Sequence, residues 1–351
     1  MKRMKSWLCL CCVLGLLASF VGCSSSAKKI EPQGRAFFTY FDTVSYVYSY
    51  AGDSEDSLNE RSAAVSGILN EYHQLFDIYH EYSGITNLCT INKLAGGEPL
   101  KVDKKLVDFL LYSKELYEIT DGEMNVMLGS VLRLWHDART AASEDPANAY
   151  IPSEEALAEA KKHTDISLLE IDAENCTVRI TDPEASIDVG ALGKGYATEK
   201  AAQYLREIGA ESYVLNIGGN ISIIGHKVDG SAWNTGIRNP QDPSGEPVVY
   251  FALADTACVT SGNYERYYIV DDEKYHHIID KDTLMPADYF DSITVITKNS
   301  ALADTFSTAL YCMSYEEGLE LAESMEDVEV LWIFGDGTMK MTSGLSALVT
   351  E

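Results

Sequence analysis

The stretch from Ser186 to Gly225 constrains the fold of this chain most, because its pattern specifies several connected elements. An apolar lead-in carries the carboxylate of Asp188 and runs into three closely spaced glycines, with Lys194 among them. Apolar residues then recur at helical spacing, so a helix is predicted over 196–208, and a glycine follows it. Two β-rich runs, joined by a Gly-Gly-Asn turn, are predicted as strands over 214–217 and 221–224.

A glycine-rich bend that opens a helix favours the binding of an anion. The backbone approaches a ligand closely at glycine, and the first N–H groups of a helix attract negative charge. Lys194 adds a full positive charge, and Asp188 could hold a hydroxyl, a ring nitrogen or a metal ion. The glycine order G-x-x-G-x-G differs from the dinucleotide fingerprint, and no Ser or Thr follows the lysine as in a P-loop. A phosphate-binding loop and a simple tight connection between strand and helix therefore both stay open.

The first residues predict a targeting segment. Basic residues precede the apolar run Trp7–Val21, which is short for a comfortable bilayer span. The run ends in Gly22 before Cys23, serines follow, and this arrangement resembles a bacterial lipoprotein signal. The interpretation divides the chain into a signal peptide over 1–22, a lipidated Cys23 with its tether over 23–35, and one folded domain over 36–351.

A chain processed in this way is expected to be exported. Its lipid at Cys23 would anchor it to the outer, extracytoplasmic face of the bacterial cell membrane. An uncleaved signal anchor is the alternative interpretation.

The charge of the chain excludes some classes of partner. With 54 acidic and 27 basic residues, the formal net charge is −27. Such a chain repels nucleic acid and anionic membrane surfaces, so no nucleic-acid partner is expected. Any anionic ligand would need a locally positive pocket or a bound cation.

Predicted helices and strands are interspersed along the rest of the chain, with no repeat or linker after the tether. The predicted helices lie over 57–79, 104–120, 152–163 and 302–313. The predicted strands lie over 36–50, as a pair within 168–180, and over 233–238, 248–253, 258–261, 267–270, 275–279 and 293–297, with a hairpin over 328–342. Segment 83–92 is predicted to be irregular, 123–135 gives mixed signals, and 141–148 is predicted to be an exposed loop. The pattern indicates a single α+β domain.

Two oxygen-bearing side chains, Asp304 and Thr308, fall one helical turn apart in the last predicted helix. They therefore lie on one face of that helix. A carboxylate and a hydroxyl are ligands for a hard cation whose remaining ligands are waters and substrate phosphates. The alternative is that the aspartate only caps or stabilises a helix start.

Two adjacent histidines, His276 and His277, lie in a predicted strand and should point to opposite faces of it. Asp280 and Asp282 follow closely. A histidine near carboxylates is a candidate general base, although a structural role for an isolated histidine is the alternative.

Five motifs occur in a fixed order in the chain, and together they resemble the ApbE family of FAD:protein FMN transferases. They are D-V-G-A-L-G-K-G-Y-A over 188–197, N-I-G-G-N over 216–220, S-G-N-Y-E-R over 261–266, H-I-I-D over 277–280, and A-D-x-x-x-T over 303–308. The resemblance covers nearly all of the chain after the tether, and members of the family are often exported lipoproteins.

The resemblance implies an α+β fold of the ApbE, T-fold-like type, with mixed or antiparallel sheets and packed helices. It implies that FAD is the substrate, that Mg²⁺ sits at its pyrophosphate, and that FMN is moved onto a Thr or Ser hydroxyl of an exported target protein while AMP leaves. Carried onto this sequence, Asp188 and Lys194 would contact FAD. The flavin would lie against Phe41, Glu123, Met124, Asn125 and Ile278.

The same resemblance implies the metal ligands and the catalytic residues. Mg²⁺ would be held by the backbone carbonyl of Ala191 together with Asp304 and Thr308, and Asp304 would also count as catalytic. His277 would be the base that accepts the proton of the target hydroxyl.

The sequence departs from the family pattern at several positions. Lys281 stands where a proline usually follows H-I-I-D, and Leu284 and Met285 replace a usual Thr-Gly. Glu123-Met124-Asn125 replaces the common Ala-Phe-Asp, and Ser307 stands where some members carry a second aspartate.

Two alternative functions stay open at this stage. An FAD pyrophosphatase would use water as the acceptor and release FMN and AMP. A non-catalytic lipoprotein would bind FAD and release neither product.

Overall fold

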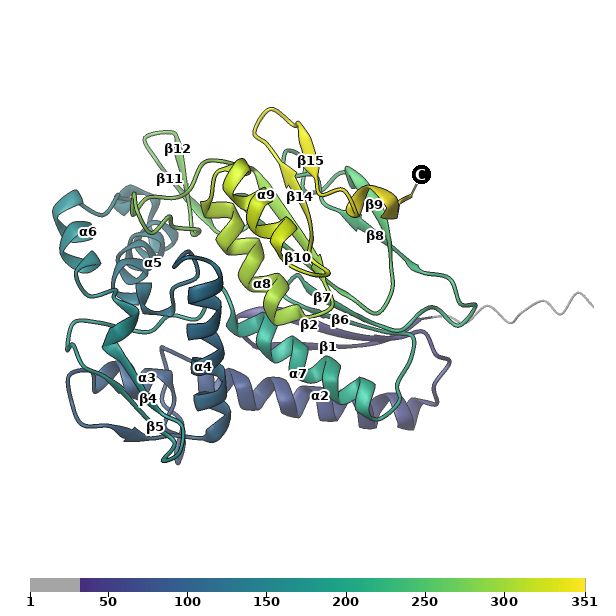
Figure 1. Cartoon of the computed structure of the whole chain (residues 1–351), viewed down its shortest axis with the longest axis horizontal. Helices are drawn as coiled ribbons and strands as arrows, with labels where there is room; N and C mark the ends of the chain where they lie inside the picture. The colour runs from purple at the N-terminus through teal and green to yellow at the C-terminus, as the bar shows by residue number, and fades with distance from the viewer. Residues whose placement is uncertain (1–31, 351) are drawn as a thin grey trace, which may run out of the picture. The chain divides into compact units, whose positions relative to one another are not determined.

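An eight-stranded antiparallel sheet forms the centre of residues 32–350, which are the residues that this computed structural model describes (Figure 1). Its order is β1-β2-β6-β7-β10-β13-β14-β15. The strands are β1 (Gln33–Tyr40), β2 (Thr43–Ser49), β6 (Tyr213–Ile217), β7 (Asn220–Ile224), β10 (Ala257–Gly262), β13 (Ser292–Thr297), β14 (Glu329–Ile333) and β15 (Met339–Met341). The sheet and the helices around it confirm the predicted α+β fold.

Three helices pack against the sheet and against one another: α2 (Glu55–Phe76), α7 (Gly193–Glu207) and α8 (Ser300–Ala309) (Figure 1). Helix α7 contacts β6 and β7, and α8 contacts β10 and β13. The alternation of side chains along a strand explains this packing. In β6, Leu215 and Ile217 are fully buried in the core beneath α2 and α7, while Val214 joins a different core.

That second core lies between the large sheet and a three-stranded sheet of order β16-β9-β8. The strands of this small sheet are β8 (Trp233–Ile237), β9 (Val249–Leu253) and β16 (Val349–Thr350). Phe251 of β9 and Leu331 of β14 are both fully buried there. Both faces of the large sheet are therefore covered, by helices on one and by strands on the other.

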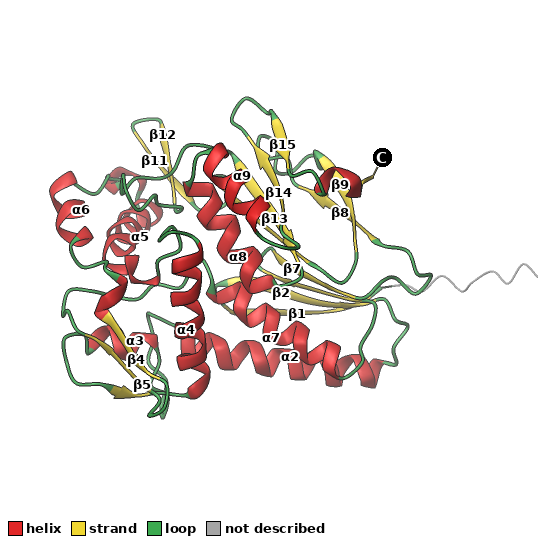
Figure 2. Cartoon of the chain, viewed as in Figure 1, coloured by secondary structure: helices red, strands yellow, loops and turns green. Residues whose placement is uncertain are grey.

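The segment between α2 and α7 holds mostly helices, with one small sheet of order β3-β5-β4 (Figure 2). Its elements are α3 (Leu88–Lys93), β3 (Leu100–Lys101), α4 (Lys104–Ile119), α5 (Gly129–Glu144), α6 (Glu154–Lys161), β4 (Leu169–Asp172) and β5 (Thr177–Ile180). Two further elements are the hairpin of β11 (Tyr267–Val270) and β12 (Glu273–His276), which packs on α5, and α9 (Tyr315–Ser324). Short 3-10 helices lie at Val126–Leu128, Pro146–Asn148, Ile166–Leu168, Leu310–Cys312 and Leu345–Leu348.

The single strand predicted over 36–50 is wrong, because the chain turns back on itself there. Phe41 and Asp42 have φ angles of 55° and 50° and connect β1 to β2 as a hairpin. A left-handed conformation is usually signalled by glycine or asparagine and is unfavourable for a phenylalanine. The sequence carries no such signal here, so the turn could not be predicted. Strand β1 also starts at Gln33, within the segment predicted as a tether.

Several short helices differ from the predictions. The segment predicted as irregular contains α3, which the side chain of Asn87 caps by accepting from the N–H of Thr90. The predicted loop 141–148 includes the last turn of α5, and α9 was not predicted at all. Short helices depend on capping and packing more than on a long periodic pattern, which explains these misses. The strand pair within 168–180 and the hairpin over 328–342 are confirmed.

The predicted signal peptide and Cys23 lie outside the described residues. Within residues 32–350, no helix has the length and apolar character needed to cross a bilayer. Cys89, Cys176, Cys258 and Cys312 are all free thiols in this part of the chain.

Helix α7 begins at Gly193 rather than at the predicted Tyr196, and its first turn packs tightly on α8. A Cβ atom on Gly195 would lie 2.5 Å from the carbonyl oxygen of Ser300, and closer still to the Cβ of Asp304. Only a glycine permits this approach of the two helices.

We predict that Gly195→Ala destabilises the protein by about 1–3 kcal/mol, because the added methyl group must push α7 away from α8. Gly67→Ala is the matched control, since Gly67 is exposed in the middle of α2 and a Cβ there meets nothing within 4 Å. The control should be stabilising by roughly 0.5–1 kcal/mol. Urea unfolding of both variants measures the difference, and equal stabilities would contradict the prediction.

Candidate functional site

The glycine-rich bend before α7 is held by hydrogen bonds that involve Asp188. The Asp188 N–H donates to the carbonyl of Val126 over 2.8 Å, and the side-chain Oδ1 accepts from the N–H of Gly190, also over 2.8 Å. Lys194 folds back so that its Nζ donates to the carbonyl of Gly190 over 3.2 Å. The residue that precedes α7, Leu192, offers no side-chain cap. At the start of α7 the N–H of Gly193 donates to the carbonyl of Val189, which leaves the N–H groups of Lys194 and Gly195 without a backbone acceptor among the described residues.

One of these N–H groups is already satisfied, by a residue far away in the sequence. The N–H of Gly195 donates to Oδ2 of Asp304 over 2.8 Å, so α8 supplies the cap that α7 lacks. The Nζ of Lys194 lies 3.7 Å from the same oxygen. Burial raises the pKa of Asp304, and the charge of Lys194 and the Gly195 N–H oppose that effect. The two sequence-predicted residues Lys194 and Asp304 thus meet at one point.

The predicted metal ligand Thr308 lies one turn beyond Asp304 and is half-buried. Its Oγ1 lies 3.4 Å from the hydroxyl of Ser261 in β10, and Ser261 in turn lies 2.8 Å from the hydroxyl of Ser307. Ser307 also donates to the backbone carbonyl of Asp304. The hydroxyl of Ser307 is therefore engaged within the protein, while that of Thr308 makes only one long contact.

Asn220, at the start of β7, is a neighbour of Asp304 that the sequence analysis did not name as a site residue. It is 1% exposed, and its amide lowers the pKa of Asp304. Its Nδ2 makes no hydrogen bond with the residues that the structure describes. The amide is therefore close enough to Asp304 to affect its pKa, although it falls short of hydrogen-bond geometry.

His277 directly follows β12 and is half-buried, whereas His276 is buried and points the other way, with Nε2 2.8 Å from the carbonyl of Ala287. The Nδ1 of His277 lies 3.2 Å from the backbone carbonyl of Arg266. A carbonyl can only accept, so Nδ1 carries the proton and the lone pair of Nε2 is free. Burial lowers the pKa of His277 to about 3, and nearby positive charges act in the same direction, that of Arg266 first. The imidazole is therefore neutral at physiological pH.

Positive groups gather around Asp188 and His277 despite the net charge of the whole chain. The pKa of Asp188 is raised by burial, and this rise is opposed by the Gly190 N–H, then by His136, Arg139 and Lys194. Arg139 and His136 lie in α5, and the guanidinium Nη2 is 3.2 Å from Nδ1 of His136. Neither residue belongs to a motif predicted from the sequence. The sequence indicates at most that they lie on a helix, and it does not indicate which residues of the fold are near them.

The residues expected to contact the flavin fall in several places. Phe41 lies at the tip of the β1–β2 turn with its ring against His73, at 5.5 Å between centroids. Met124 and Ile278 are 3% and 4% exposed and belong to two different cores. Asn125 uses its amide within the protein, accepting from the Met127 N–H and donating to a backbone carbonyl. A role for these residues in binding flavin stays a prediction.

Glu123 makes an ion pair with Lys281, at 3.0 Å between Oε1 and Nζ. Both residues are positions at which the sequence departs from the family pattern described above. The pair was not anticipated from the sequence, because 157 residues separate the two side chains in the chain.

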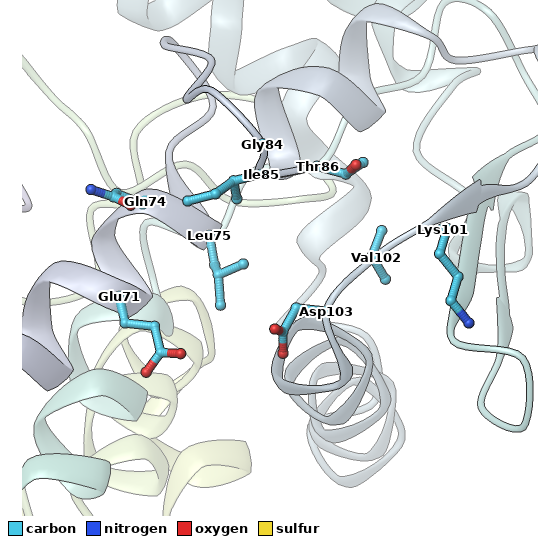
Figure 3. A pocket seen from close by; sticks show the side chains of 9 residues that line it. All are labelled: Glu71, Gln74, Leu75, Gly84, Ile85, Thr86, Lys101, Val102 and Asp103. Atoms are coloured by element: carbon cyan, nitrogen blue, oxygen red, sulfur yellow. The ribbon is translucent and has the colours of Figure 1, made fainter.

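The groove in Figure 3 lies away from this cluster. It has a volume of about 270 Å³ and is lined by Glu71, Gln74, Leu75, Gly84, Ile85, Thr86, Lys101, Val102 and Asp103. None of these is a sequence-predicted site residue, and the lining lacks the concentration of positive groups that surrounds Asp188. The candidate site is therefore the region between the start of α7, α8 and the end of β12.

Comparison with known proteins places this arrangement in a family. The family model described as "ApbE family" matches residues 41–332, which includes every motif quoted above. The chain belongs to the ApbE family.

Relatives of this ApbE chain carry a consistent name. A protein from Treponema pallidum named FAD:protein FMN transferase is 31% identical over 272 residues, covering 74% of this chain and 73% of the relative. A protein of the same name from Vibrio cholerae is 28% identical and covers 94% of both chains. The crystal structure of the ApbE protein from Thermotoga maritima superposes with a TM-score of 0.79 at 26% identity, covering 92% of this chain and 100% of that one.

We predict that His277 of this ApbE protein does not take up a proton between pH 8 and pH 5, because burial and its cationic neighbours disfavour the imidazolium. The unfolded chain does protonate the residue near pH 6.5, so this group lowers the stability of the folded state as the pH falls below about 6.5. NMR titration of labelled imidazoles measures this, with His277→Gln assigning the resonance. A His277 midpoint above pH 5 would contradict the prediction.

Proposed function

We propose that this ApbE-family protein transfers FMN from FAD to a Thr or Ser hydroxyl of an exported target protein and releases AMP. The observation that carries the proposal is the meeting of Lys194 and Asp304 at the start of α7. A cation, a carboxylate and the N–H of Lys194 at the start of a helix, all at one point, suit a substrate that carries a pyrophosphate. The names of the relatives in Treponema pallidum and Vibrio cholerae support the same reaction.

The positive groups of the site explain how so acidic a protein would bind FAD. Lys194 and Arg139 supply full positive charges near the bend, and the start of α7 adds backbone donors. Phosphoryl transfer depends mainly on neutralising and positioning the phosphates. These groups would orient the pyrophosphate so that its bond to the AMP part can break.

The residues around Asp304 fit a bound Mg²⁺ ion. Asp304 would offer a carboxylate oxygen, Thr308 a hydroxyl that is only weakly engaged, and Ala191 a backbone carbonyl. These are the hard oxygen ligands that Mg²⁺ prefers, with phosphate oxygens completing the set. Among residues 32–350, no group of three or more His, Cys, Asp or Glu side chains is arranged to hold a metal ion, so backbone and substrate oxygens would be needed. When bound, Mg²⁺ would neutralise charge that develops on the pyrophosphate.

His277 would act as the general base. Its neutral imidazole, with Nδ1 turned to the Arg266 carbonyl, leaves Nε2 to accept the proton of the target hydroxyl. The hydroxyl oxygen then forms a bond to the phosphorus of the FMN part, and the bond from that phosphorus to the AMP oxygen breaks. His277 would then pass the proton on to solvent, because its surroundings disfavour the imidazolium.

The location of the protein is part of the proposal. A lipid on Cys23 would hold the domain at the extracytoplasmic face of the cell membrane, where an exported target protein could reach the site. Labelling of cells with a radioactive fatty acid tests this, and loss of the label in Cys23→Ser with retention in the wild type is the expected result.

We predict that Asp304→Asn lowers the rate of flavin transfer at least about 100-fold, because the amide keeps the bond from the Gly195 N–H but loses the charge that a cation needs. Glu320→Ala is the control, since Glu320 is exposed on α9, and it should leave the rate unchanged. The assay combines FAD, Mg²⁺ and a candidate target, and it measures covalent fluorescence of the target in a denaturing gel together with AMP.

The same assay separates the alternatives. FMN and AMP formed without a target would indicate a pyrophosphatase, and stoichiometric FAD binding with no AMP would indicate a binding protein. Either result with the wild-type protein would overturn the proposal of flavin transfer.

A further inference from the structure

The ion pair between Glu123 and Lys281 lies mostly out of solvent. The side chains are only 14% and 26% exposed, at a distance of 3.0 Å. The second carboxylate oxygen, Oε2 of Glu123, is buried and makes no hydrogen bond with the described residues. Burial raises the pKa of Glu123, and Lys281 opposes the rise. Such a pair contributes little net stability, because removing both charges from water offsets their attraction.

Lys281 belongs to a short, closed loop that follows His277 and Ile278. Asp280 closes the loop, because its Oδ1 accepts from the N–H groups of Asp282 and Thr283 at 2.7 and 2.8 Å. Its own N–H donates to the carbonyl of Met285 over 2.9 Å. This loop directly follows His277 and Ile278, so its attachments contribute to holding the end of β12 together with the bond of His277 to Arg266.

The loop is attached to the rest of the domain from several sides, among them by the Sγ of Cys312, which donates to the carbonyl of Ile279 over 3.8 Å. The indole Nε1 of Trp135 in α5 donates to the carbonyl of Leu284 over 2.9 Å. The Nζ of Lys161 in α6 donates to the carbonyl of Lys281 over 2.6 Å. A further attachment is Glu123, which follows α4. Of these attachments, only the contact between Glu123 and Lys281 joins two side chains of opposite charge that are both largely buried.

Glu123 is also close in the chain to the other half of the candidate site. Val126, three residues later, accepts the hydrogen bond from the N–H of Asp188. A short path therefore leads from Asp188 through Val126 and Glu123 to Lys281, and then to His277. The ion pair connects the segment that holds the glycine-rich bend to the loop that holds the histidine.

We propose that Glu123 and Lys281 form a positioning pair, which sets the imidazole of His277 relative to Asp188 and the bend before α7. The proposal rests on the proposed function, in which His277 must reach the target hydroxyl while Lys194 holds the pyrophosphate. Lys281, unlike Glu123, is not among the residues expected to contact the flavin, so its substitution tests the positioning role separately from flavin binding. Displacement of a reacting group by about 1 Å costs on the order of 100-fold in rate, so a pair of low net stability still matters for the rate.

The test uses the full chain, purified in detergent, with the variants Lys281→Met, Glu123→Gln, the double variant and Lys281→Arg. Lys281→Met should lower kcat for flavin transfer about 10- to 100-fold and change the Kd for FAD less than about 3-fold. The double variant should be no slower than either single variant, because the pair is already broken. Lys281→Arg keeps the charge and should recover most of kcat.

Lys104→Met is the matched control, since Lys104 also pairs with a carboxylate, at 2.6 Å to Asp108, but at the surface of α4. It should leave kcat unchanged. A second readout is the NMR signal of the His277 imidazole without substrate, which should shift in Lys281→Met and return in Lys281→Arg.

Each outcome decides the proposal. Losses that add up in the double variant, an equal loss of FAD affinity, or an unmoved His277 signal would overturn it. If the wild type itself transfers no flavin, the proposed function fails, and the His277 signal alone then decides whether the pair positions the histidine.

Discussion

The contact between the start of α7 and the side of α8 is the interaction on which the candidate site depends. Gly195 lets the two helices approach, and its N–H is capped by Asp304 from the other helix. One hydrogen bond therefore fixes the carboxylate and brings Lys194 within 3.7 Å of it. If the helices separated, the helix start, the lysine and the carboxylate would no longer face the same space. The antiparallel sheet serves this contact by supporting both helices from below.

The candidate site is surrounded by positive charge, although the chain as a whole is strongly negative. The chain carries a net charge of −27, yet Lys194, Arg139 and His136 all act on the half-buried Asp188. The same cationic surroundings, together with burial, keep the imidazole of His277 neutral. An anionic substrate and a neutral base can therefore share one region. This follows from low exposure, since charges in bulk water would be screened from one another.

The sequence predicted the long helices α2 and α4 well, but it missed α5, which is as long as α4, and the short helices α3 and α9. The amphipathic patterns of α2 and α4 extend over several turns, so they identify helices without help from the rest of the fold. Helices α3 and α9 are short and depend on caps at Asn87 and Ser314, which local patterns signal weakly. The β1–β2 turn places Phe41 in a left-handed conformation that its sequence does not favour. Packing of the hairpin against α2 outweighs that local preference.

The sequence by itself determined the family, the α+β class and the chemical identity of the candidate groups, because the five motifs are short and read locally. It indicated that Lys194, His277 and Asp304 matter, but not how they are arranged. Only the tertiary structure decided that Asp304 caps α7, that the charge of Arg139 acts on Asp188, and that Glu123 pairs with Lys281. Each of these contacts joins segments far apart in the chain, and no local pattern specifies which distant side chain fills a given place. The glycine-rich bend was open to two interpretations on its own, and its partner α8 is what makes it one wall of a site.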